Sequence, residues 1–253
     1  MNQNVKSVML EDYKIDIGGL SQIGVDKKVN QDAFSIGVVP EKKLAYIVVA
    51  DGLGSCRNSD KGSARIVEIV EKWVVDKLPE YSFMSNNVAN ILAKRMVQEW
   101  TASYEAEEIN DYDSTVHFAV FYNGSLLVGG VGDGMALLSY DSIVCKDIAS
   151  ADDLFSNVTN SMCSINVSEL LSTEVVDKAN IKSKAIMILA TDGIADDLIP
   201  EKKLTLPGYF QETIENDGVT ALQSELEDWL GDWATENHSD DKTICYLSIE
   251  KRI

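Results

Sequence analysis

The amino-acid sequence predicts an α+β fold in which β-sheets pack together and helices lie on the outside. Apolar strands come first, two helices follow one another, and a second group of strands precedes late helices and a final strand. A parallel βαβ fold would instead alternate strands and helices regularly. The chain has 253 residues, of which 45% are hydrophobic, enough for a large buried core. Because no repeat, low-complexity tract or linker divides the chain, we expect a single domain over residues 1–253.

The first section is predicted to form strands at residues 13–18, 33–39 and 44–50, which alternate or run apolar with β-type residues. Pro40 and the polar residues 41–43 make a hairpin turn between the last two strands. The Gly- and Ser-rich segment 52–63 is expected to be a loop.

Two helices follow this loop, because apolar residues recur at helical spacing. The first contains Ala64, Val67, Ile69, Val70 and Val74, and the second contains Val88, Ile91, Leu92, Met96 and Trp100. Ser85 or Asn86 can cap the second helix, and residues 110–113 end it.

The second half of the chain is predicted to be mostly strands with late helices. Strands are expected at residues 115–121, 125–131 and 135–140, joined by turns at 122–124 and 132–134, with a further strand at 142–146. The polar stretch 149–171 has no secure assignment. Residues 184–190 form a buried strand, 211–233 are mostly helical, and 242–249 form the last strand.

The charge balance argues against a nucleic-acid partner. Lys and Arg total 22 against 41 Asp and Glu, which gives a formal net charge of −19. This field repels a phosphate backbone. Part of the acidity is explained by a solvated surface, and part can be a carboxylate cluster that awaits metal.

Nothing in the sequence indicates export or a membrane partner. Residues 1–12 lack the charged and apolar regions of a signal peptide, and no apolar run is long enough to span a bilayer. The four cysteines lie far apart without a Cys-x-x-Cys pair, which argues against a zinc ribbon and fits reduced thiols in a cytosol. We therefore expect a cytoplasmic protein.

Asp51 and Asp192 are the strongest candidates for functional residues. Each follows an apolar run of β-type residues and precedes a glycine. A carboxylate at the end of a buried strand loses solvation and needs a compensating positive charge. An Asp-Gly hairpin turn is the alternative, but neither segment leads straight into a second strand. We therefore favour metal ligation, since converging carboxylates form an oxygen cage for hard divalent cations.

Three further acidic residues are candidate ligands only because they occur together with Asp51 and Asp192. Asp32 precedes a strand, Asp240 lies just before the last strand, and Asp133 occupies a Gly-Asp-Gly turn. Alone, each is typical of an ordinary cap or turn. His117 lies in mid-strand, where a hydrogen-bonded structural role is more common than ligation, and His238 is expected in a loop.

Other catalytic chemistries find no support in the sequence. There is no Gly-x-Ser-x-Gly motif, no Cys/His pairing and no P-loop. The chemistry must therefore come from carboxylates and bound cations.

The order of the acidic segments resembles that of the metal-dependent protein phosphatases, the protein phosphatase 2C family, in a divergent bacterial-type branch. The resemblance runs from about residue 18 to residue 249, nearly the whole chain. Each motif alone is weak, but all of them in the family's order form a specific signal. The matching segments are residues 27–33, 49–54, 113–115, 131–134, 189–194 and 240–243.

The resemblance implies a four-layer αββα sandwich of two antiparallel β-sheets flanked by helix pairs. It also implies two Mn²⁺ or Mg²⁺ ions at one edge of the sandwich. By match, Asp51 bridges both ions, the carbonyl of Gly52 binds one, and Asp192 and Asp240 bind the other. Asp32 acts directly or through water.

The implied reaction is hydrolysis of a phosphate monoester on Ser or Thr by a water activated between the two cations. A phosphorylated protein is then the substrate, and a cognate Ser/Thr kinase its counterpart. The sequence does not indicate an oligomeric state.

Departures from the family pattern concern three positions. Lys27 stands where many members have an Arg that holds the substrate phosphate, and Lys offers only a point charge. Leu53 stands where eukaryotic members often have a His, which leaves the general acid unassigned. Asp133 matches the position that binds a third, weaker ion in bacterial members, but here Gly134 and Met135 follow it.

Two other functions stay open. The first is a non-catalytic regulator that keeps the fold and binds a phosphoprotein or a kinase, which the departures at residues 27 and 134–135 motivate. The second is a two-metal hydrolase of small phosphoesters such as nucleotides.

Overall fold

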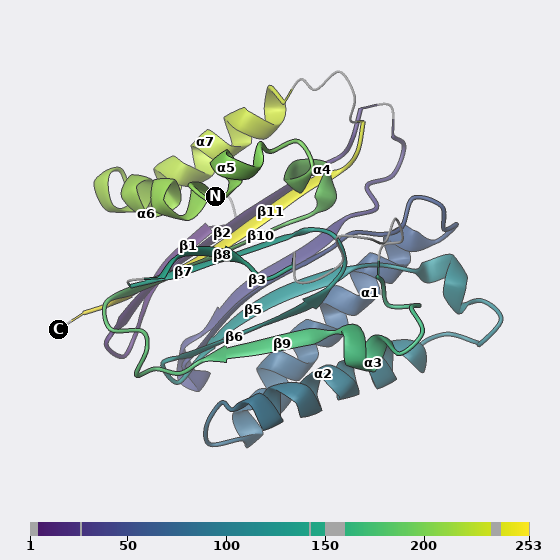
Figure 1. Cartoon of the computed structure of the whole chain (residues 1–253), viewed down its shortest axis with the longest axis horizontal. Coiled ribbons are helices and arrows are strands. Elements are labelled where there is room, and N and C mark those ends of the chain that lie inside the picture. Colours follow the sequence, from purple (N-terminus) through teal and green to yellow (C-terminus); the bar gives the residue numbers. More distant parts are fainter. Residues whose placement is uncertain (1–4, 26, 142, 150–159, 234–238, 253) are drawn as a thin grey trace.

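Two β-sheets packed face to face form the centre of the molecule, and helices cover both outer faces (Figure 1). The computed structural model describes residues 5–25, 27–141, 143–149, 160–233 and 239–252. Over these residues one sheet has six strands and the other five, and the neighbouring strands pair antiparallel. The fold is therefore the α+β sandwich of two antiparallel sheets that the sequence predicts.

The larger sheet, here called sheet A, has the order β1-β2-β11-β10-β7-β8. Its strands are β1 (Val5–Leu10), β2 (Tyr13–Gln22), β7 (Met135–Tyr140), β8 (Ile143–Asp147), β10 (Lys184–Ala190) and β11 (Lys242–Lys251). The last strand, β11, lies between β2 and β10. Ala190 is opposite both Ile244 and Met135. The end of β10 therefore meets the beginnings of β11 and β7 at one edge.

The smaller sheet, here called sheet B, has the order β3-β4-β5-β6-β9. Its strands are β3 (Ala33–Val39), β4 (Leu44–Ala50), β5 (Val116–Tyr122), β6 (Ser125–Val131) and β9 (Ser172–Val176). Asn123 and Gly124 join β5 to β6 with φ values of 51° and 87°, as a two-residue hairpin turn with positive φ requires. Ala33 is opposite Ala50, so the residues just outside this pair, Asp32 and Asp51, are neighbours.

Apolar side chains fill three layers of the sandwich. Between the sheets, alternate residues such as Ile15 and Ile17 of β2 pack with Ile47 and Val49 of β4. Helices α1 (Ser59–Lys72) and α2 (Asn86–Thr101) pack on sheet B, with Trp100 fully buried. Helices α6 (Leu206–Asn216) and α7 (Val219–Gly231) pack on sheet A. Each outer layer is thus a helix pair, as the resemblance implies (Figure 1).

Short helices connect these elements near the sheet edges. They are α3 (Val167–Leu170), α4 (Asp192–Ala195) and α5 (Pro200–Lys203). The hydroxyl of Ser85 accepts a hydrogen bond from the Val88 amide at 3.3 Å and caps α2, as predicted. Among the helices described, none is long and apolar enough to cross a bilayer.

The structure corrects several boundaries. Helix α1 begins at Ser59, inside the segment 52–63 that the sequence suggests is a loop. Ser and Gly have poor helix propensity, and burial of the first turn overrides it. The predicted helical stretch 211–233 is two helices, α6 and α7, separated by Gly218 with φ 91°. Strands β1 and β9 and the short helices α3, α4 and α5 were not predicted. Residues 150–159 of the unassigned stretch 149–171 lie outside the described residues.

Candidate metal centre

The edge where β4, β10 and the start of β11 meet brings the predicted acidic residues together. Asp51 follows β4, Asp192 follows β10, and Asp32 precedes β3. Asp51 lies close enough to Asp32, Asp192 and Asp240 to feel the charge of each. Asp192 in turn feels Asp133. Residues from five distant parts of the chain therefore share one electrostatic site.

The backbone of Asp51 is held by Ser114 and Thr115, the two residues just before β5. Its carbonyl oxygen accepts hydrogen bonds from the Thr115 amide and the Ser114 hydroxyl, both at 2.8 Å. The amide of Gly52 donates to the carbonyl of Gln31 at 3.1 Å. A Cβ on Gly52 would lie 2.5 Å from the carbonyl oxygen of Ser59. Glycine is thus required here by close backbone packing rather than by a hairpin.

Asp32 is held by Thr191, which follows β10, and by Thr243 of β11. Its Oδ2 atom accepts hydrogen bonds from the hydroxyls of Thr191 at 2.8 Å and Thr243 at 2.7 Å. Its Oδ1 atom is buried and has no hydrogen-bond partner among the described residues. One oxygen of Asp32 therefore ties sheet B to sheet A, and the other is left to interact with a cation.

Asp192 is the first residue of α4, and its Oδ1 atom is also buried without a hydrogen-bond partner in the described chain. A Cβ on the following Gly193 would lie 2.0 Å from the carbonyl oxygen of Asp241. The Asp-Gly dipeptide is therefore again explained by close packing, here against the beginning of β11.

The electrostatics of this cluster show that it lacks positive charge. Burial raises the pKa of Asp51 far above its usual value, and the charges of Asp32 and Asp192 raise it further. Burial also raises the pKa of Asp32, against the hydrogen bonds from its threonines. The pKa of Asp192 rises through burial and the charges of Asp133 and Asp240. A divalent cation would relieve this repulsion and satisfy the two unpartnered oxygens.

The donor set fits a hard cation in chemistry, but its side chains are not yet arranged as ligands. All the donors are oxygens, which Mg²⁺ and Mn²⁺ prefer. Within the described ranges, however, no three His, Cys, Asp or Glu side chains are spaced to hold a metal ion as they stand. Ligation by these side chains therefore stays a prediction.

Lys27 already provides one positive charge at the edge of the cluster. Its ammonium pairs with Asp240 and, at 3.1 Å, with Oδ2 of Asp241. Burial lowers the pKa of Lys27, but the hydrogen bonds that it donates to both carboxylates, together with their charges, outweigh burial and raise the pKa overall. The Lys27 ammonium is thus paired with Asp240, a predicted metal ligand, instead of being directed towards a substrate phosphate.

Asp241 is a site residue that the sequence reasoning missed. It is only 1% exposed and accepts hydrogen bonds at 2.8 Å from the amides of Gly24 and Gln31. Together with its pair to Lys27, these bonds fasten the segment before Asp32 to the start of β11. The sequence contains two adjacent acids here, Asp240 and Asp241, and only Asp240 was predicted to be a site residue.

Asp113 is a second residue whose role was not predicted. Its Oδ1 accepts from the amides of Ser114 and Cys163 at 2.8 and 2.9 Å, and its Oδ2 accepts from the Ser161 hydroxyl at 2.7 Å. The amide of Met162 donates to the carbonyl of Ser114. Residues 160–171 are therefore attached beside the segment that holds Asp51. The sequence motif at 113–115 indicated this position, but it did not predict the contact of Asp113 with Ser161 and Cys163.

The two histidines add no ligand that the structure can establish. His117 is buried in β5, and burial lowers its pKa to about 4. Its Nε2 atom has no hydrogen-bond partner in the described part of the chain, so the expectation of a fully hydrogen-bonded histidine is wrong. His238 lies outside the described residues.

Comparison with known proteins yields one family. A family model described as protein phosphatase 2C matches residues 21–231. No curated protein sequence matches the chain.

Several solved structures share the fold at low sequence identity. The catalytic domain of the serine/threonine protein phosphatase PstP, in complex with two manganese ions, has a TM-score of 0.67 at 14% identity, covering 94% of this chain and 99% of that one. RsbX in complex with magnesium has a TM-score of 0.62 at 15% identity, covering 97% and 100%. The phosphatase domain of SpoIIE from Bacillus subtilis has a TM-score of 0.56 at 15% identity, covering 96% and 95%.

Proposed function

Because the chain belongs to the protein phosphatase 2C family, we propose that it is a metal-dependent phosphatase that hydrolyses phosphoserine and phosphothreonine esters in proteins. The observation that carries this proposal is the group of buried carboxylates whose pKa values rise through burial and mutual repulsion. Two of them, Asp32 and Asp192, also have a buried oxygen without a partner among the described residues. Such a group is stabilised by divalent cations.

We assign the ligands from the matched positions. Asp51 and the Gly52 carbonyl would hold one ion, and Asp51, Asp192 and Asp240 would hold a second. Asp32 contributes directly or through water, and Asp133 holds a third, weaker ion. The ions are Mn²⁺ or Mg²⁺, which is supported by the metals in the similar PstP and RsbX structures. When bound, such ions supply the Lewis acidity that activates water and neutralises charge on the phosphoryl group.

The protein's own residues orient this chemistry. Thr191 and Thr243 hold Asp32 in one rotamer. Ser114 and Thr115 hold the backbone of Asp51, so the carboxylate starts from a rigid strand end. Asp241 keeps Lys27 at the site, where the ammonium can leave Asp240 for a substrate phosphate when a metal ion takes that carboxylate. We place this activity in a single cytoplasmic domain with a phosphorylated protein partner, a cognate kinase, and no nucleic-acid or membrane partner.

The test is hydrolysis of p-nitrophenyl phosphate and of phosphoserine and phosphothreonine peptides with Mn²⁺, with and without a chelator. We expect Asp51→Asn and Asp192→Asn each to lower kcat at least about a hundredfold, because each removes a charge that the metal ions need. Asp228→Asn, on the exposed face of α7, is the matched control and should leave the rate unchanged. Activity that withstands the chelator or both site variants contradicts the proposal.

The ion pair between Lys27 and Asp240 favours a second candidate function, a non-catalytic member of the family that binds a phosphoprotein or kinase. In that case calorimetry would detect binding of a phosphopeptide without turnover. A third candidate, hydrolysis of small phosphoesters, would appear as a preference for nucleotides over phosphopeptides in the same assay.

A further inference from the structure

A cavity at the other end of sheet A contains a buried carboxylate that the proposed metal centre does not use. The cavity has a volume of about 230 Å³ and lies between β2, β11, β10 and helix α6. Asp16 of β2 lines it and is only 2% exposed. Strand β11 reaches the metal centre at its first residues and this cavity at its last ones. At about 3.3 Å per residue, roughly 20–30 Å separate the two places.

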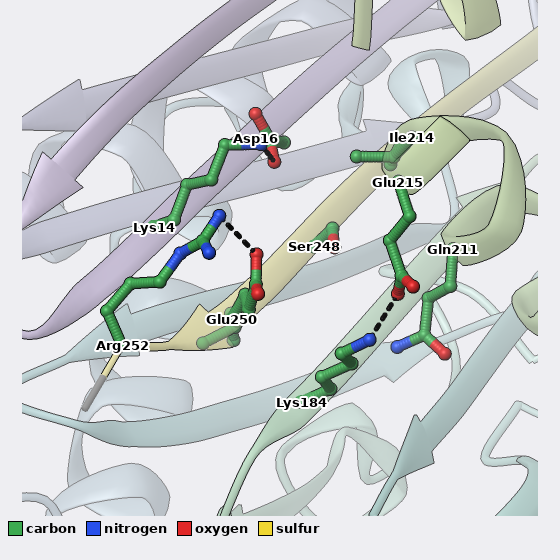
Figure 2. A pocket seen from close by; sticks show the side chains of 10 residues that line it. Lys14, Asp16, Lys184, Gln211, Ile214, Glu215, Ser248, Glu250 and Arg252 are labelled. Carbon is green, nitrogen blue, oxygen red and sulfur yellow. Dashed lines mark hydrogen bonds and ion pairs between the residues drawn. The ribbon is translucent and has the colours of Figure 1, made fainter. Parts of the chain in front are cut away.

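The strand register explains how the cavity is built. Lys14 of β2 and Lys184 of β10 both lie opposite Glu250 of β11, so charges alternate across three strands. Two residues further along β2, Asp16 lies opposite Ser248 of β11. These residues face outward because the alternate ones, such as Ile15 and Ile249, are buried between the sheets. Figure 2 shows Lys14, Asp16 and Glu250 on one side of the cavity, and Lys184 beside Glu215 and Gln211 of α6 on the other.

Each cation of the cavity already pairs with a carboxylate. Lys14 donates to Oδ2 of Asp16 at 2.7 Å, Lys184 donates to Glu215 at 2.5 Å, and Arg252 pairs with Glu250 at 2.9 Å. Three positive and three negative side chains thus cancel, in a chain whose formal net charge is −19. A ligand of zero net charge therefore meets no net electrostatic penalty in this cavity.

Asp16 shows what the ligand must offer. Its Oδ1 atom is buried and has no hydrogen-bond partner in the described part of the chain. Leaving such an acceptor unsatisfied is costly, and a ligand ammonium group would satisfy it with a charge-assisted bond. Next to it, Lys14 and Arg252 have donors beyond those used in their ion pairs, because an ammonium has three and a guanidinium five. These donors suit a carboxylate.

We infer that this cavity binds a small zwitterion that carries an ammonium and a carboxylate group, such as a free α-amino acid. The ammonium meets Asp16, and the carboxylate meets Lys14 and Arg252. The volume of about 230 Å³ is smaller than that of pockets for drug-sized ligands, which measure about 300–1,000 Å³, so only a smaller molecule fits.

Calorimetry and thermal shift on the full chain test this site without any reference to phosphatase activity. The probes are the twenty common amino acids, putrescine as an amine without carboxylate, and succinate as a carboxylate without amine. We expect at least one amino acid to bind with a Kd below 1 mM, a threshold of about −4 kcal/mol. Putrescine and succinate should bind at least tenfold more weakly.

Variants then locate the binding. Asp16→Asn and Arg252→Gln should each weaken the amino acid about tenfold or more, since each removes one charged partner. The side chain of Arg252 is 54% exposed, so Arg252→Gln should fold even if Asp16→Asn does not. Glu212→Gln, on the same helix α6 but outside the cavity, is the matched control.

Three outcomes would overturn the inference. No amino acid binds with a Kd below 1 mM, which means that the cavity is not a site for a free amino acid. Putrescine or succinate binds as well as any amino acid, which means that the site does not select a zwitterion. Binding is unchanged in both Asp16→Asn and Arg252→Gln, which means that the ligand binds elsewhere.

Discussion

Asp241 connects the segment before Asp32 to the start of β11 beside the proposed metal centre. It is almost completely buried, and its two oxygens accept from two backbone amides and from Lys27. The neighbouring Asp240 has a side chain that is 42% exposed and shares the same lysine. Two adjacent acids therefore have separate tasks, since Asp241 fastens the loop and Asp240 is the one proposed to bind metal.

Asp241→Asn should destabilise the fold. The amide keeps the shape of the side chain but turns one acceptor into a donor, which then faces the donor of Gly24 or Gln31. We expect a loss of about 1–3 kcal/mol in the free energy of unfolding, measured by urea denaturation. Asp240→Asn is the control and should cost less than about 1 kcal/mol, because its ion pair is half exposed. Equal losses in the two variants would refute this division of tasks.

The sequence revealed the acids of the site but not their surroundings. Asp51 and Asp192 were recognisable because each ends an apolar strand and precedes glycine. The threonines that hold Asp32, and the pair between Lys27 and Asp241, depend on contacts between residues more than 150 positions apart. Neither spacing nor local propensity can predict which distant hydroxyl or ammonium a carboxylate meets.

At the scale of elements, the close approach of α1 to the segment before β5 sets where the helix can lie. A Cβ on Gly62 would lie 1.7 Å from the carbonyl oxygen of Tyr112, so no larger residue fits without moving one of the two. The amide of Asn58 donates to the carbonyl of Asp111 in the same contact. Helix α1 is therefore fixed against the residues that precede Asp113.

Gly62→Ala should lower stability although alanine is the better helix former. We expect a loss of about 2–4 kcal/mol in the free energy of unfolding, measured by chemical denaturation, because the backbone must shift. Gly208→Ala is the matched control, since Gly208 lies in α6 with no atom near its missing Cβ. That variant should gain about 0.5–1 kcal/mol. A gain in both variants would show that α1 can move away from Tyr112.

A second element-scale prediction concerns the turn after β7. Asp141 has a positive φ of 43°, and its carboxylate accepts from the amides of Lys182, Ser183 and Lys184 and from the Ser183 hydroxyl. Slight burial raises the pKa of Asp141, but these hydrogen bonds outweigh it and lower the pKa to about 2, from 3.8. The stabilisation is therefore present above pH 4 and disappears as the pH falls from 4 towards 2.

Asp141→Asn should cost less than about 1 kcal/mol at pH 7, since the group is largely exposed and water screens it. The measurement is urea denaturation of both proteins between pH 7 and pH 3, and the difference between them should shrink below pH 4. Asp12→Asn, in an exposed turn, serves as the control. A difference that stays constant down to pH 3 would mean that the charge of Asp141 is not what stabilises the turn.

Strong patterns made most of the fold predictable. Buried strands such as β4 and β10 have continuous apolar runs, and the α+β class follows from their order. The missed strands are edge strands: β1 and β9 are mostly only partly buried, and each pairs on one side in the sheets described. Their pairing comes from the sheet that they join rather than from their own residues.

At the scale of the whole molecule, the sandwich holds together a cluster of negatively charged residues that lowers the stability of the fold. The chain has a formal net charge of −19, and the buried acids at the sheet edge add local repulsion. Functional sites commonly break the rules of stable packing in this way, and the rest of the fold compensates. The stability of the protein should therefore depend on divalent cations.

The Asp192→Asn variant distinguishes the repulsion between the carboxylates from the stabilisation by bound metal. Without metal, the variant should be more stable than the parent protein by about 1–3 kcal/mol at pH 7, because a neutral amide no longer repels Asp133 and Asp240. With Mn²⁺ at a hundred times its Kd, the parent gains about 2.7 kcal/mol, or roughly 5–10 °C in Tm for a chain of this size. The variant should gain much less, so its advantage in Tm over the parent should disappear or reverse. Differential scanning calorimetry with chelator and with Mn²⁺ measures both effects, with Asp228→Asn as the control that should follow the parent. If Mn²⁺ stabilises Asp192→Asn as much as the parent, Asp192 does not bind the metal.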